Sequence, residues 1–539
     1  MEFVKVVHDA ILSSGRRAYV YLTLASLGTF AISVLVNSVT DYDPAHGPDY
    51  ELLVAFILVC AVTVVSRGET TRIMNAVGEG LAHHMRQQYA RLLRRADFAE
   101  VERIGKDTIY TTLARNAQVL AESPAVLAQG VASVGAFILA TLYIAYLSLL
   151  AAAAIAVLIF VVYLASQFRK EHTQDDLAAG QKAEQEFFDT FSHYLHGLKE
   201  ARMDPDRGDD LFENFLTARA NRARELRLKA LDSMIAFGVV VFGSFYLLLG
   251  TVTFITPQYV ETASIAMKIV YTSSVMWLLI ESLLRIMPTV ARGNAAFTEL
   301  RKLEVKLRAV QRPDPQTQLP LPKLRSLELR GIAYTYPPQE EDGQPFAIGP
   351  CDLLLKPGEA TFLVGGNGSG KTTLLRNLCL LYRPQAGAVL WNGVPVTDET
   401  AADYRRRISA VFADFHLFDR IYGNRDIDPA RVAAMLERVQ LNAKTRYVNG
   451  HFTTLDLSTG QRKRLALALA LLENRDIYLF DEIAADQDPN FRRRIYEEFI
   501  PELKARGKAV LAITHDERYF GTADAIYFMD EGQLSRRST

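Results

Sequence analysis

The stretch Leu363-Val-Gly-Gly-Asn-Gly-Ser-Gly-Lys-Thr-Thr373 is the strongest structural signal in this chain. It fits the pattern G-x-x-x-x-G-K-[ST], and an apolar run of β type, Ala360–Val364, stands directly before it. A loop this rich in glycine turns successive backbone N–H groups toward one phosphate, and the helix that follows adds the positive end of its dipole. We expect Lys371 to reach the β- and γ-phosphates of a nucleotide and the Thr372 hydroxyl to be a ligand of Mg²⁺.

Length and composition restrict the class of protein. A chain of 539 residues predicts several domains, and a formal net charge of −1 gives no case for nucleic-acid binding. Three cysteines, Cys60, Cys351 and Cys379, are too few and too scattered for a disulfide framework or a metal site, so we expect them to be reduced. The N-terminal Met1–Arg17 is not expected to be a signal peptide, because the apolar run after it is long enough to span a bilayer and no small-residue cleavage site follows.

Apolar runs recur through the first 290 residues. A membrane span needs about 20 apolar residues. On this basis we predict six spans, at Tyr19–Asn37, Leu52–Val65, Val126–Leu147, Leu149–Ser166, Ile235–Ile255 and Ser264–Met287. The third and fourth are almost continuous and must turn sharply near Tyr146-Leu-Ser148. A soluble ATPase that acts on DNA or ribosomes is disfavoured by so many lipid-compatible runs.

Charge asymmetry orients the spans. The connections Val39–Tyr50 and Thr256–Thr262 carry no Lys or Arg, whereas Arg67–Pro124 holds nine and Phe168–Ala230 holds eleven. Because basic connections stay in the cytoplasm, both termini are predicted to be cytoplasmic.

The two basic connections have mixed charged and apolar residues at helical spacing. We expect the helices to run on past the bilayer, and each pair to end in a short transverse element within Asp97–Gly105 or Tyr194–Arg202. A pair of independent soluble insertions is the alternative.

The last predicted span carries Lys268, Glu281 and Arg285. Charges in a span are functional candidates, but Lys268 is near the outer end and can snorkel, and the other two are i,i+4 neighbours that can pair. We expect Tyr271 and Trp277 to be packing residues rather than a ligand cage.

Beyond Arg301 the apolar density falls, and the segments Arg312–Pro315 and Leu319–Pro322 break helices. The remainder alternates short β-like runs with helices, as in α/β nucleotide folds. We therefore predict a transmembrane domain at 1–305, a linker at 306–326 and an α/β phosphate-loop domain at 327–539.

A second signal is Ile477-Tyr-Leu-Phe-Asp481, an apolar strand that ends in an acid. An Asp at this place holds Mg²⁺ directly or through water, and the following Glu482 is positioned to polarise an attacking water. An ordinary solvated turn is the alternative, which the buried-looking strand disfavours.

A third signal, Leu457-Ser-Thr-Gly-Gln461, precedes a predicted helix at Arg462–Leu472. Ser458 is a candidate N-cap, and Gly460 permits a phosphate to approach the helix start. Taken alone, such a stretch is usually only a cap.

Two further residues become candidates for nucleotide binding because of their positions relative to these three motifs. His515 ends the apolar strand Ala509–Thr514, where a γ-phosphate sensor is useful, although a lone His there is usually a satisfied polar residue. Tyr336 offers an aromatic face on which adenine can stack, although by itself it would be interpreted as an ordinary aromatic residue of a strand.

The order of these motifs resembles the ABC transporter family, and the whole chain is similar to an exporter-type half-transporter. The resemblance implies roles for three groups of residues. The catalytic group is Glu482 as general base, His515 as the switch histidine and Lys371; the metal ligands are Thr372 and Asp481; and the ATP-binding group is Tyr336, Gly365, Asn367, Gly368, Ser369, Gly370, Lys371, Thr372, Thr373, the signature residues Ser458, Gly460 and Gln461, and the D-loop residue Asp488. In this family the signature of one subunit closes over ATP held by the other, so one nucleotide domain implies a homodimer.

Three segments, Ser409–Asp419, Asp481–Pro489 and Thr514–Phe520, resemble the bacterial exporters of cyclic peptides, lipopeptides and peptide siderophores. One position departs from the wider family, because Ala413 stands where a glutamine usually contacts Mg²⁺. Our hypothesis is that Asp414 takes over that task.

The resemblance implies a translocase, an ATPase that exports such a peptide across the bacterial inner membrane with ATP and Mg²⁺. The alternatives are an exporter of lipid or drugs and an exporter-fold importer of siderophores. A leader-cleaving peptide exporter is disfavoured, because about eighteen residues without cysteine precede the first span.

Overall fold

The computed structural model describes residues 2–13, 15–41, 49–259, 262–312, 319–337, 345–424 and 426–537. The chain divides into two compact units. The helical unit comprises Met1–Ala90 and Ile109–Glu304, and the α/β unit comprises Arg91–Thr108 and Val305–Thr539. The sequence boundaries assigned residues 91–108 to the first domain, whereas in the structure this segment packs with the α/β unit.

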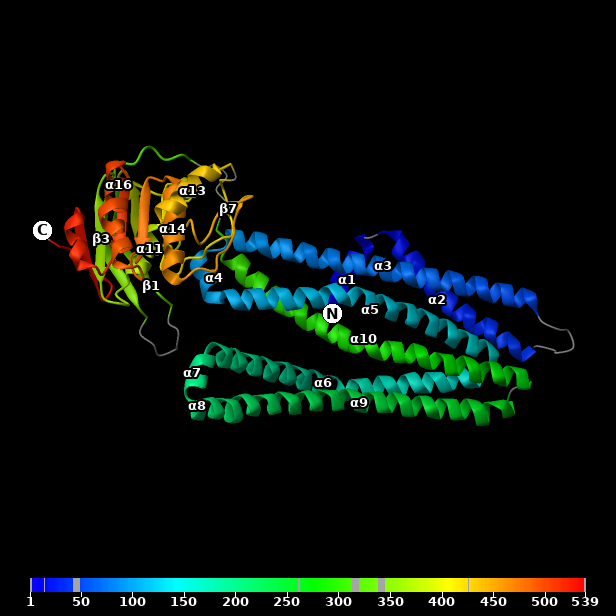
Figure 1. Cartoon of the computed structure of the whole chain (residues 1–539). Helices are drawn as coiled ribbons and strands as arrows, with labels where there is room; N and C mark the ends of the chain where they lie inside the picture. The colour runs from blue at the N-terminus through cyan, green and yellow to red at the C-terminus, as the bar shows by residue number, and fades with distance from the viewer. Residues whose placement is uncertain are drawn as a thin grey trace. The chain divides into compact units, whose positions relative to one another are not determined.

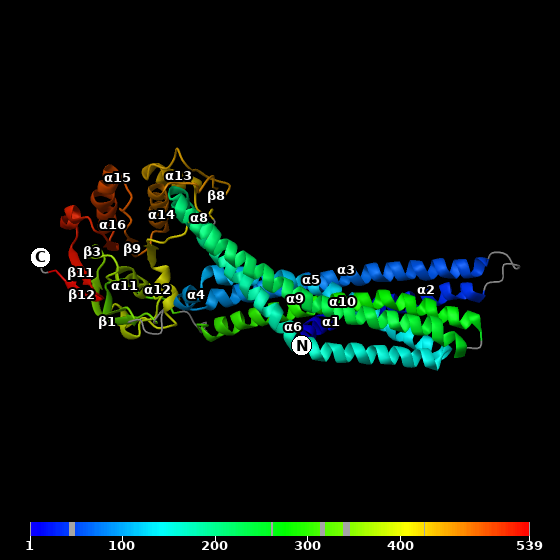
Figure 2. The same cartoon turned by 90° about the horizontal axis from the view of Figure 1, so that it is seen from below.

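The described part of the helical unit is built from long helices (Figure 1). Its elements are α1 (Glu2–Ser13), α2 (Arg16–Asn37), η1 (Ser38–Asp41), α3 (Tyr50–Arg95), α5 (Lys106–Leu147), α6 (Leu149–His196), α7 (Leu198–Met203), α8 (Pro205–Asp210), η3 (Leu211–Thr217), α9 (Ala218–Gly250), η4 (Thr251–Ile255), η5 (Thr256–Tyr259) and α10 (Ala263–Ala309). Helices α6 and α9 lie side by side (Figure 2). The short helix α4 (Phe98–Ile104) belongs to the α/β unit.

Among the described residues, five helical stretches are long and apolar enough to cross a membrane, and a shorter apolar helix covers Leu149–Ala165. The five are Arg16–Asp41, Tyr50–Arg95, Lys106–Leu147, Pro205–Tyr259 and Ala263–Ala309. Each contains or overlaps a run predicted from the sequence, and the fourth predicted run is the shorter helix. The helices also continue far beyond the apolar runs, as the two basic connections predicted.

The helix breaks have local causes. Helix α5 ends at Leu147, and the Ser148 side chain caps α6 by accepting a hydrogen bond from the Ala151 N–H. Asp97 caps α4 in the same way through the Ala99 N–H, and Gly105, at φ +90°, ends it. The predicted breaks within Tyr146–Ser148 and Asp97–Gly105 are therefore confirmed. The second connection breaks at Gly197, between α6 and α7.

Small residues let the helices of the helical unit approach closely. A Cβ on Gly78 of α3 would lie 1.9 Å from the Ala121 carbonyl oxygen of α5, and one on Gly28 would lie 2.1 Å from the Thr63 hydroxyl. Hydrogen bonds also cross between helices, from the Asn37 amide to Thr272 Oγ1 at 2.7 Å and from the Ser133 hydroxyl to Ser282 at 2.9 Å. Small and polar interfaces of this kind are typical of helix packing in membranes.

The α/β unit is built around a six-stranded sheet of order β12-β11-β3-β10-β9-β6 and a four-stranded sheet of order β2-β1-β4-β5. The strands are β1 (Leu327–Thr335), β2 (Ala347–Leu355), β3 (Ala360–Gly365), β4 (Ala386–Trp391), β5 (Val394–Pro395), β6 (Ile408–Val411), β7 (Tyr447–Val448), β8 (His451–Phe452), β9 (Ile477–Asp481), β10 (Ala509–Ile513), β11 (Ala525–Asp530) and β12 (Gln533–Arg536). The helices are α11 (Lys371–Leu378), α12 (Ala401–Arg406), α13 (Pro429–Arg438), α14 (Thr459–Glu473), α15 (Pro489–Arg494), η6 (Ile495–Phe499), α16 (Ile500–Ala505) and η7 (Glu517–Thr522).

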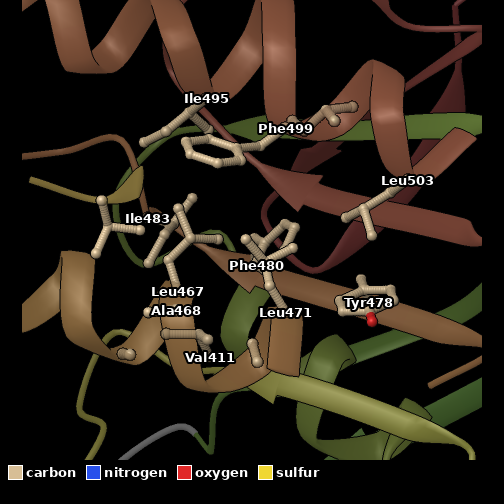
Figure 3. Close-up of a cluster of buried hydrophobic side chains, with 14 of the residues drawn as sticks. Val411, Leu467, Ala468, Leu471, Tyr478, Phe480, Ile483, Ile495, Phe499 and Leu503 are labelled. Carbon is tan, nitrogen blue, oxygen red and sulfur yellow. The ribbon is translucent and has the colours of Figure 1, made fainter. Parts of the chain in front are cut away.

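A continuous apolar core fixes the larger sheet against its helices (Figure 3). Phe480 and Tyr478 of β9 meet Leu467 and Leu471 of α14, and Phe499 approaches from η6. The strand β9 is buried at every position. This is the pattern of a parallel strand covered on both faces, and it holds the end of β9 in a fixed place.

Candidate functional site

The candidate site lies where three neighbouring strands end. Strands β3, β10 and β9 are parallel, with Leu363 in register with Ile513 and Ile513 in register with Asp481. Their carboxyl ends therefore share one edge of the sheet, and the segments that follow them begin there. Binding sites in such sheets form at this edge.

The phosphate loop follows β3. Gly368 and Gly370 have φ of +78° and +105°, and a Cβ on Gly370 would lie 2.5 Å from the Ile348 side chain. Glycine is therefore required at 370 by both conformation and space. Asn367 is exposed, while Ser369 is buried and its hydroxyl has no hydrogen-bond partner among the described residues. An unpaired buried hydroxyl beside the start of α11 fits a site that binds phosphate oxygens.

Lys371 is buried at the first position of α11. Its ammonium group donates to the Gly365 carbonyl at 2.9 Å and the Gly366 carbonyl at 2.7 Å. Burial lowers the pKa of Lys371, and the nearby Glu482 and Asp481 oppose that shift. The charge is thus held inside the loop, against carbonyl groups that a phosphate would replace as partners.

Thr372 and Asp481 meet, as their motifs predicted. The Thr372 hydroxyl donates to Asp481 Oδ2 at 3.0 Å, and the Ala413 N–H lies 3.4 Å from the same oxygen. Burial raises the pKa of Asp481, and the hydrogen bond from Thr372 opposes the shift. A hydroxyl and a carboxylate at this separation are hard oxygen donors, which fit Mg²⁺ held together with phosphate oxygens and water.

Glu482 and His515 also face each other. His515 Nε2 lies 3.3 Å from Glu482 Oε1, and both side chains are partly exposed. Glu482 has a left-handed backbone, with φ +52°, directly after the end of β9. The two residues therefore present an acid and an imidazole to solvent beside Asp481.

Tyr336 directly follows β1. Its hydroxyl lies 3.1 Å from Thr373 Oγ1, and its ring lies among Tyr334, Phe346 and Tyr382 at centroid distances of 5.3, 6.3 and 5.9 Å. This contact ties Tyr336 to α11, near the phosphate loop.

The signature segment starts α14 and forms a capping box. The Ser458 hydroxyl accepts from the Gln461 N–H, and the Gln461 side chain accepts from the Ser458 N–H. A Cβ on Gly460 would lie 2.6 Å from the Asp486 carbonyl oxygen, and the Gln487 side chain donates to the Gly460 carbonyl at 2.9 Å. The predicted cap at Ser458 is confirmed. The close approach of the Asp486 carbonyl leaves no room for a side chain at Gly460, a constraint that the sequence did not reveal.

Asp488 is the N-cap of α15. Its Oδ1 accepts from the Asn490 and Phe491 N–H groups, and Oδ2 accepts from Arg464. The hydrogen bond from the Phe491 N–H is the main cause that lowers the pKa of Asp488. The hydrogen bonds described above for the signature segment and Asp488 lie along α14 and the 486–491 region, whereas the phosphate loop and the start of α11 bond to β9 and to carbonyl groups of the loop itself.

Asp414 does not bond to Asp481 or Thr372 through any contact in the described structure. Its carboxylate accepts from Arg376 Nη2 at 3.0 Å. The hypothesis that Asp414 contacts the metal therefore has no geometric support here, while the Ala413 N–H does approach Asp481.

The charged residues of the last predicted span, Lys268, Glu281 and Arg285, lie on α10. Lys268 pairs with Asp41, which also accepts from the Ser264 hydroxyl at 2.6 Å, so Lys268 is bound to a neighbouring helix. The side chain of Arg285 lies outside the described residues, and its pairing with Glu281 remains a prediction.

The chain is similar to several known proteins. A family model described as ABC transporter matches residues 348–485. The chain is 40% identical over 301 residues to the ATP-binding protein SyrD of Pseudomonas syringae pv. syringae, which covers 53% of this chain and 52% of SyrD. It is 32% identical over 232 residues to an ATP-dependent lipid A-core flippase of Bordetella pertussis, which covers 40% and 36%.

Two further matches complete the comparison. A lipoprotein-releasing system ATP-binding protein, LolD 2 of Chlorobaculum tepidum, is 32% identical over 205 residues, which cover 34% of this chain and 81% of LolD 2. The matched region spans about half the length of SyrD. Across its whole length the fold is similar to a bacterial Atm1-family ABC exporter with ATP bound, with a TM-score of 0.76, 16% identity, and coverage of 98% of this chain and 95% of the other.

Proposed function

Because the chain belongs to the ABC transporter family and has the fold of an exporter-type half-transporter, we propose that it is an ATP-driven exporter. In this proposal it is a homodimer with six spans per subunit in the bacterial inner membrane, and both termini are cytoplasmic. The observation that carries the proposal is the meeting of Thr372 with Asp481, beside Glu482 and His515.

The proposed ATP site extends from Tyr336 to the loop Gly365–Thr373. The Tyr336 ring stacks on adenine, and the phosphates lie on the loop N–H groups at the start of α11. Lys371 exchanges its bonds to the Gly365 and Gly366 carbonyls for phosphate oxygens. Phosphoryl transfer needs positioning and charge stabilisation more than covalent chemistry, and this is what the loop supplies.

Hydrolysis requires a group that orients water. Glu482 is the proposed general base, and His515, 3.3 Å away, is the proposed sensor of the γ-phosphate. Mg²⁺, held by the Thr372 hydroxyl and the Asp481 carboxylate, would neutralise charge on the phosphate oxygens when bound.

The signature segment is proposed to act on ATP in the other subunit. Ser458 and Thr459 are exposed at the start of α14, where the helix dipole favours an anion. With Gly460, Gln461 and Asp488 they would face the partner's phosphates, so each of two sites needs residues from both chains. Loss of the γ-phosphate then removes the affinity difference that holds the subunits closed.

The proposed cargo is a cyclic peptide, a lipopeptide or a peptide siderophore. The support is the resemblance of Ser409–Asp419, Asp481–Pro489 and Thr514–Phe520 to exporters of such compounds. A second candidate is a lipid flippase, favoured by the similarity to a lipid A-core flippase. A siderophore importer of the same fold is distinguished by the direction of accumulation in inverted vesicles.

The substitution Glu482→Gln tests the proposed chemistry. Removing a general base is expected to reduce ATP turnover by about 10²–10⁴-fold, while ATP binding and ATP-dependent dimer closure remain. The full chain in nanodiscs is assayed for phosphate release and for binding of a fluorescent ATP analogue. Turnover near that of the unaltered protein would contradict the assignment of Glu482.

A further inference from the structure

The short helix α4 is held to the α/β unit at its first turn. Arg312 donates to Asp97 Oδ2 from Nε at 2.8 Å and from Nη2 at 2.6 Å. The same guanidinium donates to the Leu380 and Leu381 carbonyls, each at 3.0 Å. Asp97 also caps α4, so its carboxylate joins the start of α4 to the chain that follows α11.

A second arginine holds the last turn of α4, and it lies on the helix of the phosphate loop. Arg376, on α11, donates from Nη1 to Glu102 Oε2 at 3.3 Å and from Nη2 to Asp414 Oδ2 at 3.0 Å. The Arg376 side chain is only 14% exposed. A largely buried guanidinium between two carboxylates forms stronger hydrogen bonds than a neutral donor or a solvated pair.

Tyr382 joins this cluster to the proposed adenine site. Its hydroxyl accepts from Arg376 Nη1 at 2.7 Å and donates to Glu102 Oε2. The side chains of Arg376, Tyr382 and Glu102 are therefore hydrogen-bonded to one another in pairs. Its buried ring stacks on Tyr334 at 5.0 Å and meets the edge of Tyr336 at 5.9 Å. On the other side the ring lies 6.3 Å from Phe98 of α4.

Asp414 joins the same cluster to the proposed metal acid. It follows Ala413, whose N–H lies 3.4 Å from Asp481 Oδ2. Arg376 is five residues after Lys371 on one rigid helix. One guanidinium is therefore linked to α4, to the segment beside Asp481 and, through Tyr382, to Tyr336.

We propose that Arg376 is a positioning residue that couples the nucleotide site to α4, by fixing Glu102 and Asp414 to the helix that starts at the phosphate loop. This inference rests on the proposed function, because it assumes that ATP binds at that loop. A shift of α11 or of the Ala413–Asp414 segment on ATP binding moves α4 with it. Since α4 connects α3 to α5, the shift is delivered to two of the long apolar helices. In this proposal Asp414 serves as a partner of Arg376 rather than as a metal ligand.

The test separates ATP binding from the response of the membrane helices. The full chain, with its native cysteines replaced by serine, is spin-labelled at Glu51→Cys, an exposed position at the start of α3, and placed in nanodiscs. The distance between the two copies of residue 51 is measured with and without Mg²⁺-ATP. Binding of a fluorescent ATP analogue and the thermal midpoint are measured on the same samples.

For Arg376→Gln we expect analogue affinity within about twofold of the parent, and a fraction of ATP-switched molecules at least about fivefold lower, the range of ordinary coupling between sites. Arg376→Lys keeps the charge and is expected to recover part of the switching. The matched control is Arg330→Gln, an exposed arginine of β1 that pairs with Glu328, which is expected to leave every readout unchanged.

Two further variants keep the test decisive if Arg376→Gln lowers the thermal midpoint. Glu102→Gln and Asp414→Asn each remove one arm of the link, and each is expected to reduce switching without loss of binding. Adding Glu102→Gln to Arg376→Gln is expected to have less effect than Glu102→Gln has alone, because the bond of Arg376 to Glu102 is already lost and only the bond from the Tyr382 hydroxyl remains. Normal switching in all three single variants would overturn the inference. A parent protein that binds no ATP would instead refute the proposed function itself.

Discussion

Helix α3 of the helical unit exposes large apolar side chains and buries small or polar ones in its apolar part, whereas strand β9 of the α/β unit buries its apolar side chains. In α3, Leu58 and Val64 are 60% and 70% exposed, while Thr63 and Ser66 are buried. In the α/β unit, β9 is buried from Ile477 to Asp481. The difference shows that β9 places its apolar side chains in the core of the α/β unit, whereas α3 leaves apolar side chains free for a lipid environment, where helix packing depends on close approach.

The largest difference between the two units is expected from a leucine-to-alanine substitution made once in each. Leu467→Ala removes a side chain from the core of Figure 3, and such changes cost about 2–5 kcal/mol. Leu58→Ala removes an exposed side chain of α3 and is expected to cost under about 0.5 kcal/mol. Thermal midpoints of the full chain in nanodiscs check both values. Equal losses would mean that α3 is packed against protein at this position.

A smaller effect is expected from close helix approach. Gly78→Ala places a methyl group 1.9 Å from the Ala121 carbonyl oxygen, so α3 and α5 must separate. Overpacking of this kind costs about 1–3 kcal/mol. A Cβ on Gly80, two residues along α3, would meet no other element of the described chain within 4 Å, so Gly80→Ala is the matched control. It is expected to be neutral or slightly stabilising, because alanine favours a helix over glycine. Equal midpoints for the two variants would contradict the packing account.

How far the sequence predicts the structure also differs between the units. In the α/β unit, local patterns located Thr372, Asp481 and the Ser458 cap, because strand ends and helix starts are set by a few neighbouring residues. The cluster of Arg376, Glu102 and Tyr382 had no local signal, since Glu102 and Arg376 lie 274 residues apart.

In the helical unit, composition located the apolar runs and the break at Ser148. It did not indicate which faces of the helices pack, because glycine, alanine and serine positions carry little hydrophobic pattern. The contact of Gly78 with Ala121 and the bond of Asn37 to Thr272 depend on the tertiary arrangement.

The smallest expected effect concerns the cap of α14. Ser458→Ala removes the side-chain acceptor of the Gln461 N–H, at a cost of about 0.5–2 kcal/mol, whereas Ser458→Gly costs only a few tenths. If the Ser458 hydroxyl also contacts ATP, both variants lose turnover although only Ser458→Ala loses stability. Full turnover in Ser458→Gly would limit this residue to capping.

The most direct measurement of the central claim, a site shared by two chains, mixes two inactive variants. Lys371→Ala removes the proposed phosphate-binding cation, and Ser458→Asp keeps a good N-cap but places a negative charge at the proposed γ-phosphate contact. Each homodimer is expected to be nearly inactive. A purified heterodimer of the two has one site with both defects and one intact site, and we predict ATP turnover well above either homodimer. A heterodimer no more active than either homodimer would contradict the shared site.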